Sequence, residues 1–305
     1  MLEINFRIKV FYVVAKELSF TRAARELFIS QPAVSKHIQE LETSIGQALF
    51  LRKGKGLVLT EAGHTLLDSA KVIMKEYALA DYRLGLLRDQ VVGQLIVGAS
   101  TTLAQYIMPK LIAGFVKEYP DVRIKLFNGN TADVDRWLND KRIGIGFVEG
   151  LPEDSSLKYS KLWGDSLVPV ARPDHPIFKD ATIKLDDLRR QEFIFREQGS
   201  GTNDIVFQRF KQFGIEIKEL LNRVQMSSSE SIKRYVELSD CIGIMSIHAV
   251  KDELERKDLR LVEVEGFSIH RHLYMVHLHG EVSGLPKLFM RYVEKNKSAC
   301  DNYML

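Results

Sequence analysis

Two short amphipathic segments meet at a tight turn within residues 19–42, and this feature constrains the fold more than any other. The first can begin at a capping Thr21, and the small side chains of Ala23-Ala24 let another helix cross closely. The second begins at Ser30, with Pro32 in its first turn, where a missing amide hydrogen costs little. This arrangement predicts a helix-turn-helix.

The second helix has one apolar and one polar face. Val34, Ile38 and Leu41 recur at i, i+4 and i+7 and form a buried stripe. An ordinary helical hairpin with a polar outer face is one interpretation. The other is a recognition helix, whose exposed face must read base edges and neutralise phosphates in a major groove. The residues on that face are Gln31, Pro32, Ser35, Lys36 and Gln39.

Basic residues are concentrated around this segment. Residues 1–59 hold nine Lys or Arg and five Asp or Glu, a charge of +4. Residues 60–92 carry −1, and residues 93–305 are neutral. A module that faces phosphates requires such an excess.

The segment 49–59 has two apolar arms around a Lys-Gly-Lys-Gly tip, which predicts a β-hairpin beside the recognition helix. Such a wing would hold Arg52, Lys53 and Lys55 in solvent, where they can meet phosphates or the minor groove. A solvated basic loop is the alternative. A first helix over residues 4–16 is expected to cover the helix-turn-helix.

A long helix is expected from residue 60 to about residue 89. A seam of three heptads favours a dimer formed by the same helix of a second subunit, with two recognition helices on a two-fold DNA site. Packing against its own domain is the alternative. The seam consists of Leu66, Ala70, Ile73, Tyr77, Ala80, Leu84 and Leu87.

Strands alternate with helices from Gly93 onward, which predicts a doubly wound α/β domain with two lobes and a cleft. We expect the chain to cross between the lobes near Lys161 and Phe267. Lobe I then spans about 93–162 and 268–305, and lobe II about 163–267. Helices are expected at 103–119 and 132–140, and strands at 94–99, 122–128, 143–149, 166–171, 192–196, 222–226, 242–246, 259–264 and 272–276.

Several classes of protein are disfavoured. No apolar run approaches the ~20 residues that span a bilayer, and the N-terminus lacks the form of a signal peptide, so we expect a cytoplasmic protein without a membrane partner. Cys241 and Cys300 are too few for a disulfide framework or a four-ligand zinc site. A metal site at His270 and His272 is less favoured than ordinary strand histidines. The sequence shows no nucleophile that can be paired with a general base, so no catalytic residue, cofactor or enzymatic activity is predicted.

The predicted parts follow one another as a winged helix-turn-helix (1–59), a linker helix (60–92) and a two-lobed domain (93–305). In this order of parts, the chain resembles the LysR-type transcriptional regulators over essentially its whole length. The residues that carry the resemblance are Phe11, Ser19-Phe20-Thr21, Ala23-Ala24, Leu27, Ser30 to Ser35, Ile38, Leu41-Glu42, Leu49-Phe50, Arg52 and Leu59 to Gly63.

The resemblance implies contacts with double-stranded promoter DNA, a homodimer or homotetramer, and control of the transcription machinery. It also implies a periplasmic-binding-protein-like C-terminal domain with a small co-inducer in its cleft. The implied DNA contacts are Thr21, Gln31, Pro32, Ser35, Lys36 and Arg52, and Arg22, Lys53 and Lys55 complete the predicted set.

Ligands of open α/β lobes sit beyond the carboxyl ends of strands, where helix N-termini present free amides. Two such places are rich in hydroxyl groups: Ser100-Thr101-Thr102 and the string from Arg196 to Thr202. Glycines expose backbone amides, hydroxyls donate, and Arg196 supplies a cation, so we expect a small anionic effector. Ordinary helix capping is the alternative. The full predicted set is Ser100, Thr101, Thr102, Asn130, Thr131, Phe147, Glu149, Arg196, Gly199, Ser200, Gly201, Thr202, Ser227 and Ser246.

The string from Arg196 to Thr202 is similar to one in LysR-type regulators of sulfur and inorganic carbon metabolism. It suggests sulfite, sulfate, or a phosphorylated or carboxylated metabolite, without choosing among them. A small-anion receptor whose N-terminal helices only oligomerise, and an enzyme on the α/β lobes, are the competing functions. Neither explains a basic excess confined to residues 1–59.

Overall fold

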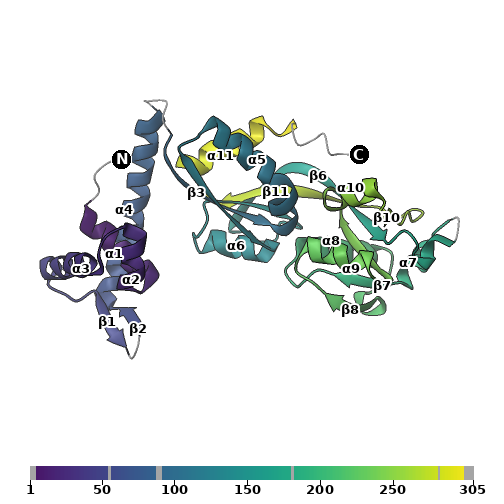
Figure 1. Cartoon of the computed structure of the whole chain (residues 1–305), viewed down its shortest axis with the longest axis horizontal. Coiled ribbons are helices and arrows are strands. Elements are labelled where there is room, and N and C mark those ends of the chain that lie inside the picture. Colours follow the sequence, from purple (N-terminus) through teal and green to yellow (C-terminus); the bar gives the residue numbers. More distant parts are fainter. Residues whose placement is uncertain (1–4, 54–55, 87–90, 180–181, 281, 299–305) are drawn as a thin grey trace. The chain divides into compact units, whose positions relative to one another are not determined.

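The structure is a computed structural model that describes residues 5–53, 56–86, 91–179, 182–280 and 282–298 (Figure 1). Its contacts divide the chain into two compact units, Met1–Gly93 and Gln94–Leu305. In the described part, no helix has both the length and the apolar character needed to cross a membrane.

The first unit begins with three helices, α1 (Phe6–Glu17), α2 (Phe20–Leu27) and α3 (Gln31–Ile45). The hydroxyl of Ser19 accepts a hydrogen bond from the amide of Arg22 at 3.3 Å, so Ser19 caps α2. The expectation that Thr21 is the cap was wrong, because α2 begins one residue before it. Ser30 caps α3 by accepting from the amide of Ala33 at 3.3 Å, as the sequence predicts.

The core of this unit joins the three helices. Val34, Ile38 and Leu41 are all buried, which confirms the apolar stripe of α3. They pack with Phe11, which is fully buried, and with Ala23-Ala24. The small alanines permit this close helix crossing.

A two-stranded hairpin follows, with β1 (Phe50–Lys53) paired antiparallel to β2 (Gly56–Leu59). The Glu42 carboxylate of α3 accepts hydrogen bonds from the amides of Leu49 and Phe50 at 2.7 and 3.3 Å. These bonds fix the start of the hairpin against α3. The predicted wing is therefore present, held by a residue of α3 itself.

The long helix α4 spans Glu61–Leu86. Leu66 and Ala70 pack into the core of their own unit, so this part of the predicted seam is used locally. Ile73 and Leu84 are 38% and 41% exposed. Leu87 lies outside the described residues.

The second unit is built on one mixed sheet in the order β4-β3-β5-β11-β6-β9-β7-β8, with β10 paired to β6. β3 and β5 are parallel, as is β7 with both β8 and β9. The strands are β3 (Gly93–Ser100), β4 (Val122–Gly129), β5 (Ile145–Glu149), β6 (Leu157–Ala171), β7 (Glu192–Phe195), β8 (Leu221–Gln225), β9 (Cys241–Ser246), β10 (Arg260–Leu261) and β11 (Ile269–Leu278).

Two long strands join the lobes. β6 and β11 are antiparallel partners from Leu167↔Ile269 to Leu157↔Leu278. β11 also pairs with β5 of lobe I, and β6 with β9 of lobe II. The strands expected at 166–171 and 272–276 were therefore too short, because polar residues such as Lys158 and Lys161 obscure the apolar pattern. The strand expected at 259–264 forms only β10 and an isolated bridge at Val264.

Helices cover both faces of this sheet (Figure 1). The helix expected at 103–119 begins as a π-helix, because Pro109 has no amide hydrogen and Met108 donates back to the carbonyl of Leu103. The helical elements are η1 (Leu103–Ile107), α5 (Met108–Glu118), α6 (Thr131–Asn139), η2 (Pro176–Lys179), α7 (Leu185–Arg189), α8 (Gly201–Gln212), η3 (Ile217–Glu219), α9 (Ser229–Glu237), α10 (Ile247–Arg256) and α11 (Gly284–Lys295).

Candidate functional site

The outer face of α3 is polar and open. Gln31, Pro32 and Lys36 are exposed and Ser35 is half-buried. The Gln31 side-chain amide donates to the Ser35 hydroxyl at 2.9 Å. The Lys36 side chain is 76% exposed and only 4.0 Å from the Glu40 carboxylate. All four predicted α3 residues thus lie within the first two turns, and Lys36 retains most of its hydration.

The other predicted DNA contacts differ in availability. Thr21 and Arg52 are exposed. The Arg22 guanidinium is engaged with α1, where its Nε lies 3.0 Å from the Glu17 carboxylate and its Nη2 donates to the Glu17 carbonyl. Lys53 belongs to β1, and Lys55 lies outside the described residues. Arg22 therefore also stabilises the α1–α2 corner.

In the second unit, the hydroxyls after β3 converge on the carboxylate at the end of β5. Glu149 is only 2% exposed. It accepts hydrogen bonds from the Ser100 hydroxyl and, at 3.2 Å, from the Thr102 hydroxyl. The predicted hydroxyl cluster already donates to a carboxyl group of the chain itself.

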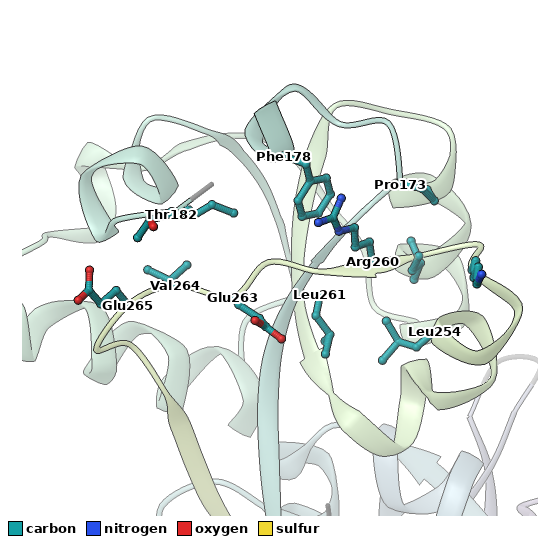
Figure 2. A pocket seen from close by; sticks show the side chains of 12 residues that line it. Pro173, Phe178, Thr182, Leu254, Arg260, Leu261, Glu263, Val264 and Glu265 are labelled. Atoms are coloured by element: carbon teal, nitrogen blue, oxygen red, sulfur yellow. The ribbon is translucent and has the colours of Figure 1, made fainter. Parts of the chain in front are cut away.

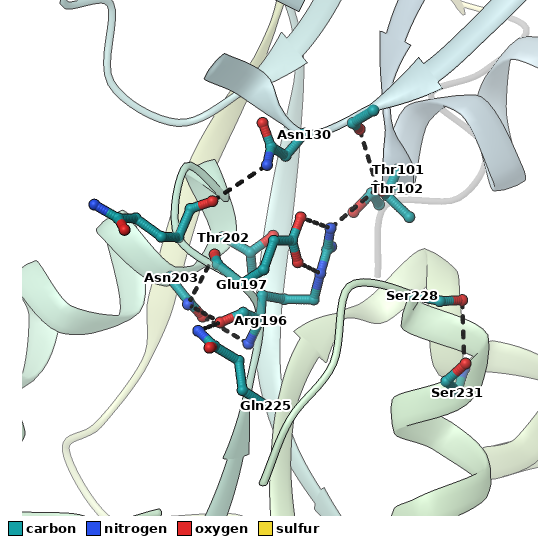
Figure 3. A network of polar contacts seen from close by, with 12 residues as sticks. Thr101, Thr102, Asn130, Arg196, Glu197, Thr202, Asn203, Gln225, Ser228 and Ser231 are labelled. Atoms are coloured by element: carbon teal, nitrogen blue, oxygen red, sulfur yellow. Dashed lines mark hydrogen bonds and ion pairs between the residues drawn. The ribbon is translucent and has the colours of Figure 1, made fainter. Parts of the chain in front are cut away.

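Arg196 reaches from lobe II to lobe I (Figure 3). It is 5% exposed, and its Nη2 donates to the Thr101 hydroxyl at 3.0 Å. The Glu197 carboxylate accepts from its Nε and Nη2 at 2.9 and 3.0 Å. The structure buries this predicted cation in a bidentate ion pair.

The start of α8 packs closely on the end of β5. The Thr131 hydroxyl donates to the Glu149 carbonyl at 2.6 Å. A Cβ on Gly201 would lie 2.0 Å from that same carbonyl oxygen, so only glycine fits there. The Asn130 side chain caps α6 and donates to the Gln198 carbonyl at 3.2 Å (Figure 3). Gly199 adopts a φ of +84°, a conformation that favours glycine.

A second arginine completes the cluster, and sequence reasoning missed it. Arg271 of β11 has a fully buried side chain, with its Nε 2.7 Å from Asp165. Its Nη1 donates to the Thr202 hydroxyl at 2.8 Å and lies 3.9 Å from Glu149. The Ser246 hydroxyl donates to Asp165 at 2.8 Å.

The signal for Arg271 is present in the strand pattern. Side chains of Ile269, Arg271 and Leu273 point to one face of β11, and all three are buried. Asp165 is the register partner of Arg271 on β6. A charged residue within a buried alternation indicates a paired site, but the pairing needs the register of the two strands.

Two donors in this cluster have no partner among the described residues, the Ser200 hydroxyl and Arg271 Nη2. Ser200 is 1% exposed and Arg271 is 4% exposed. Buried donors without partners are rare and call for an explanation.

The charges of the cluster nearly cancel. Arg196 and Arg271 face the carboxylates of Glu149, Asp165 and Glu197, which leaves −1. Burial lowers the pKa of the nearby His248, although Asp165 opposes that shift. His248 is therefore neutral at pH 7 and adds no charge.

Two predicted residues lie apart from the cluster. Phe147 is fully buried, with its ring 5.9 Å from that of Phe289, so it belongs to the aromatic core of lobe I. Ser227 is exposed.

A separate hollow of about 770 Å³ lies elsewhere on lobe II, with the Arg260 guanidinium 4.2 Å from the centre of the Phe178 ring (Figure 2). None of the predicted effector residues lines it.

No group of His, Cys, Asp and Glu within the described ranges is arranged to hold a metal ion. His270 Nδ1 lies 3.2 Å from the Ser166 hydroxyl. Cys241 is a buried, free cysteine, and Cys300 lies outside the described residues.

A winged helix-turn-helix, followed by a two-lobed domain with a buried polar cluster where the lobes meet, defines the class of DNA-binding regulators that carry an effector domain. Family models agree in both parts. The bacterial regulatory helix-turn-helix of the lysR family matches residues 7–64, and the LysR substrate binding domain matches residues 88–297. The chain belongs to the LysR family of transcriptional regulators, which are not enzymes.

Individual relatives cover most of the chain. The RuBisCO operon transcriptional regulator of Allochromatium vinosum is 31% identical over 90% of both proteins. The regulator CysL of Bacillus subtilis is 29% identical over 88% of this chain and 89% of its own.

Solved structures share the fold. Full-length CbnR complexed with its target DNA has a TM-score of 0.64 and 21% identity, covering 96% of this chain and 99% of CbnR. The CcmR regulatory domain of Synechocystis in complex with 2-PG has a TM-score of 0.61 and 26% identity, covering 69% of this chain and 98% of that domain.

Proposed function

We propose that this regulator binds promoter DNA as a cytoplasmic homo-oligomer and that a small anion bound between the lobes of its second unit controls it. The observation that carries the anion proposal is the buried cluster around the start of α8. There, hydroxyls and two arginines from both lobes converge, and two donors lack partners.

For DNA, the proposed reading surface is the N-terminal half of α3 with the wing. Gln31 and Ser35 can read base edges, and Lys36 and Arg52 can neutralise phosphates, with Thr21, Pro32, Lys53 and Lys55 beside them. The exposure of Lys36 and Arg52 supports this assignment. We give Arg22 a supporting role, because its guanidinium is already bound to Glu17.

For assembly, the proposed surface is the second half of α4. Ile73 and Leu84 remain exposed after the helix has packed Leu66 and Ala70 into its own unit. Apolar residues that continue a heptad seam favour a partner helix, and the same helix of a second subunit places two recognition helices on one DNA site.

For the effector, relatives point to two areas of metabolism. The RuBisCO operon regulator of Allochromatium vinosum and CysL are 31% and 29% identical to this chain. The regulatory domain of CcmR was solved with 2-PG. We therefore propose a role in inorganic carbon or sulfur metabolism. The proposed ligand is a small molecule with an acid group, held by Arg196, Thr101 and the start of α8.

Control follows from which lobe each contact belongs to. Arg196 and Thr101 come from different lobes, as do Asn130 and Gln198, so we expect these bonds to break when the lobes separate. An anion that binds the closed lobes better than the open ones shifts the population toward closure. The resulting change reaches the DNA contacts through the oligomer.

Calorimetric titration of the full chain with a panel of small anions tests this function. We expect at least one anion to bind wild type and to lose at least ~10-fold in affinity in Arg196→Ala, because the interlobe cation is gone. Lys36→Ala is the matched control, since it removes a cation of the first unit and should leave the titration unchanged. Binding of only neutral or cationic ligands would overturn the proposal.

A further inference from the structure

Both residues with unpartnered donors are associated with the start of α8. Ser200 is its N-cap residue, and Arg271 donates to Thr202 of its first turn at 2.8 Å through Nη1, while the Ser200 hydroxyl and Arg271 Nη2 have no partner among the described residues. A buried donor without an acceptor costs about 1–3 kcal/mol, so two of them favour an acceptor that enters from outside. The first backbone bond of α8 runs from Asp204 to Ser200 at 3.2 Å, which leaves the amides before Asp204 at the positive end of a 12-residue helix.

Glu149 stands directly against this donor group. Its carboxylate is 3.9 Å from Arg271, and its carbonyl oxygen is in contact with Gly201 of α8. Ser100 and Thr102 each give it one hydrogen bond. A carboxylate has about four acceptor positions, so it can accept further donors but can give none.

Arg271 is shared between two acid groups, because its Nε lies 2.7 Å from Asp165 while its Nη1 lies 3.9 Å from Glu149. A fully ionised oxyanion in this position would therefore turn its lone pairs toward those of a buried carboxylate. An anion that still carries a proton, or a hydroxyl beside its acid group, would instead donate a hydrogen bond to Glu149. The site would then select its ligand by repelling anions that have no hydrogen-bond donor for Glu149.

We propose that Glu149 makes the effector site selective for anions that carry a hydrogen-bond donor, such as hydrogenphosphate or an α-hydroxycarboxylate, and excludes sulfate. This inference rests on the anion-binding function proposed above and narrows its ligand class. Ser200, Arg271 and the start of α8 bind the acceptor oxygens, and Glu149 accepts the ligand's proton donor.

Titration of the full chain with sodium phosphate and sodium sulfate at pH 7 and equal ionic strength tests the proposal. The two ions are alike in shape, but only phosphate retains a proton at this pH. We expect wild type to prefer phosphate by about 10-fold or more. In Glu149→Gln, whose amide can donate to sulfate, that ratio should fall by about 10-fold. Glu255→Gln, on the exposed face of α10, is the matched control and should keep the wild-type ratio.

Ser200→Ala separates a ligand donor from a structural residue. Removing a buried hydroxyl that has no partner should leave the ligand-free melting temperature unchanged or raised, while phosphate affinity falls about 5-fold. A lowered melting temperature with unchanged affinity would overturn the assignment of this donor. If Glu149→Gln does not fold, the wild-type ratio and Ser200→Ala still decide the outcome.

The remaining outcomes distinguish the two proposals. Equal or tighter binding of sulfate by wild type, or an unchanged ratio in Glu149→Gln, would overturn the selectivity and leave the anion site standing. Failure of wild type to bind either ion, or any member of the wider anion panel, would overturn both.

Discussion

The starts of α3 and α8 use similar residues in opposite surroundings. Each helix follows a serine, Ser30 or Ser200, and each has polar groups in its first turn. Ser30 caps its helix and is exposed, and Gln31 beside it is open to solvent. Ser200 makes no cap bond, and both it and Thr202 are buried. An exposed helix start is open to a macromolecular surface, whereas a buried one is closed to it.

The two regions also differ in how their charges are neutralised. Lys36 on α3 has one distant partner at 4.0 Å, so its charge is available to a phosphate. Arg196 and Arg271 are each bound to a carboxylate within 2.9 Å. Substitutions of the paired charges in the buried region should therefore affect stability, and those on α3 should affect binding.

The largest effect is expected at Arg271. Arg271→Met removes the guanidinium that pairs with the buried Asp165, to which the Ser246 hydroxyl still donates at 2.8 Å. Loss of one partner of a buried pair costs about 3–5 kcal/mol, so the second unit should melt much earlier in calorimetry of the full chain. The double variant Asp165→Asn with Arg271→Met should recover part of that loss. Equal melting of the single variant and wild type would show that the cluster is not a buried ion pair.

A smaller effect is expected at Glu42, which joins the wing to α3. Glu42→Ala removes the acceptor of two amides and should cost about 2–3 kcal/mol in the first unit. Urea unfolding followed by a probe in that unit measures this loss. Glu42→Gln keeps an acceptor without the charge and should lose less. If the alanine variant loses no more than the glutamine variant, Glu42 does not hold the wing.

On the open face of α3, Gln31→Ala should reduce discrimination between the operator and its point variants by about 1–3 kcal/mol at one base pair. Lys36→Ala should instead weaken binding to all sequences and lower the salt slope by about 1. Fluorescence anisotropy over a salt series measures both quantities. Neither variant should change the melting temperature by much. A Lys36→Ala variant with lowered stability and normal DNA affinity would contradict the contrast between the exposed α3 and the buried start of α8.

Asp135 offers the smallest test, because it is a half-buried carboxylate that forms no ion pair with the described residues. Burial raises the pKa of Asp135 to about 6, against a hydrogen bond from Tyr159 at 3.0 Å. Between about pH 4 and pH 6 the unfolded chain loses this proton while the folded chain keeps it, so stability falls as pH rises.

Asp135→Asn should remove that slope and raise stability at pH 7 by about 1–2 kcal/mol, allowing for partial exposure. Asp154 is the matched control, because hydrogen bonds from Ser156 lower its pKa, whereas the pKa of Asp135 is raised. Asp154→Asn should lose stability at neutral pH. Urea unfolding at several pH values measures both, and an unchanged slope in Asp135→Asn would show that its carboxylate ionises normally.

The contrast between α3 and α8 also explains what the sequence could predict. The helix-turn-helix, its wing and the buried stripe of α3 follow from local patterns, because caps and helical spacing act within a few residues. Ser100, Thr102 and Thr202 could be selected as a cluster, because strand ends and helix starts have a local signature.

Arg271, Asp165 and the burial of Arg196 depend on contacts that no local pattern encodes. Arg271 and Asp165 meet through the register of β6 and β11, two strands separated by lobe II. Polar residues in β6 interrupt the apolar pattern, so the sequence predicted only the last part of that strand. For the same reason, the sequence could not show that Glu149 already occupies the hydroxyls of Ser100 and Thr102.

The central claim is that an anion in the second unit controls DNA binding by the first. The most direct test is the affinity of the full chain for its own upstream DNA, measured by anisotropy with and without phosphate at constant ionic strength. We predict salt-sensitive, sequence-dependent binding that phosphate changes in wild type and leaves unchanged in Arg196→Ala. Absence of sequence-dependent binding at low salt, or the same phosphate response in both proteins, would contradict the account.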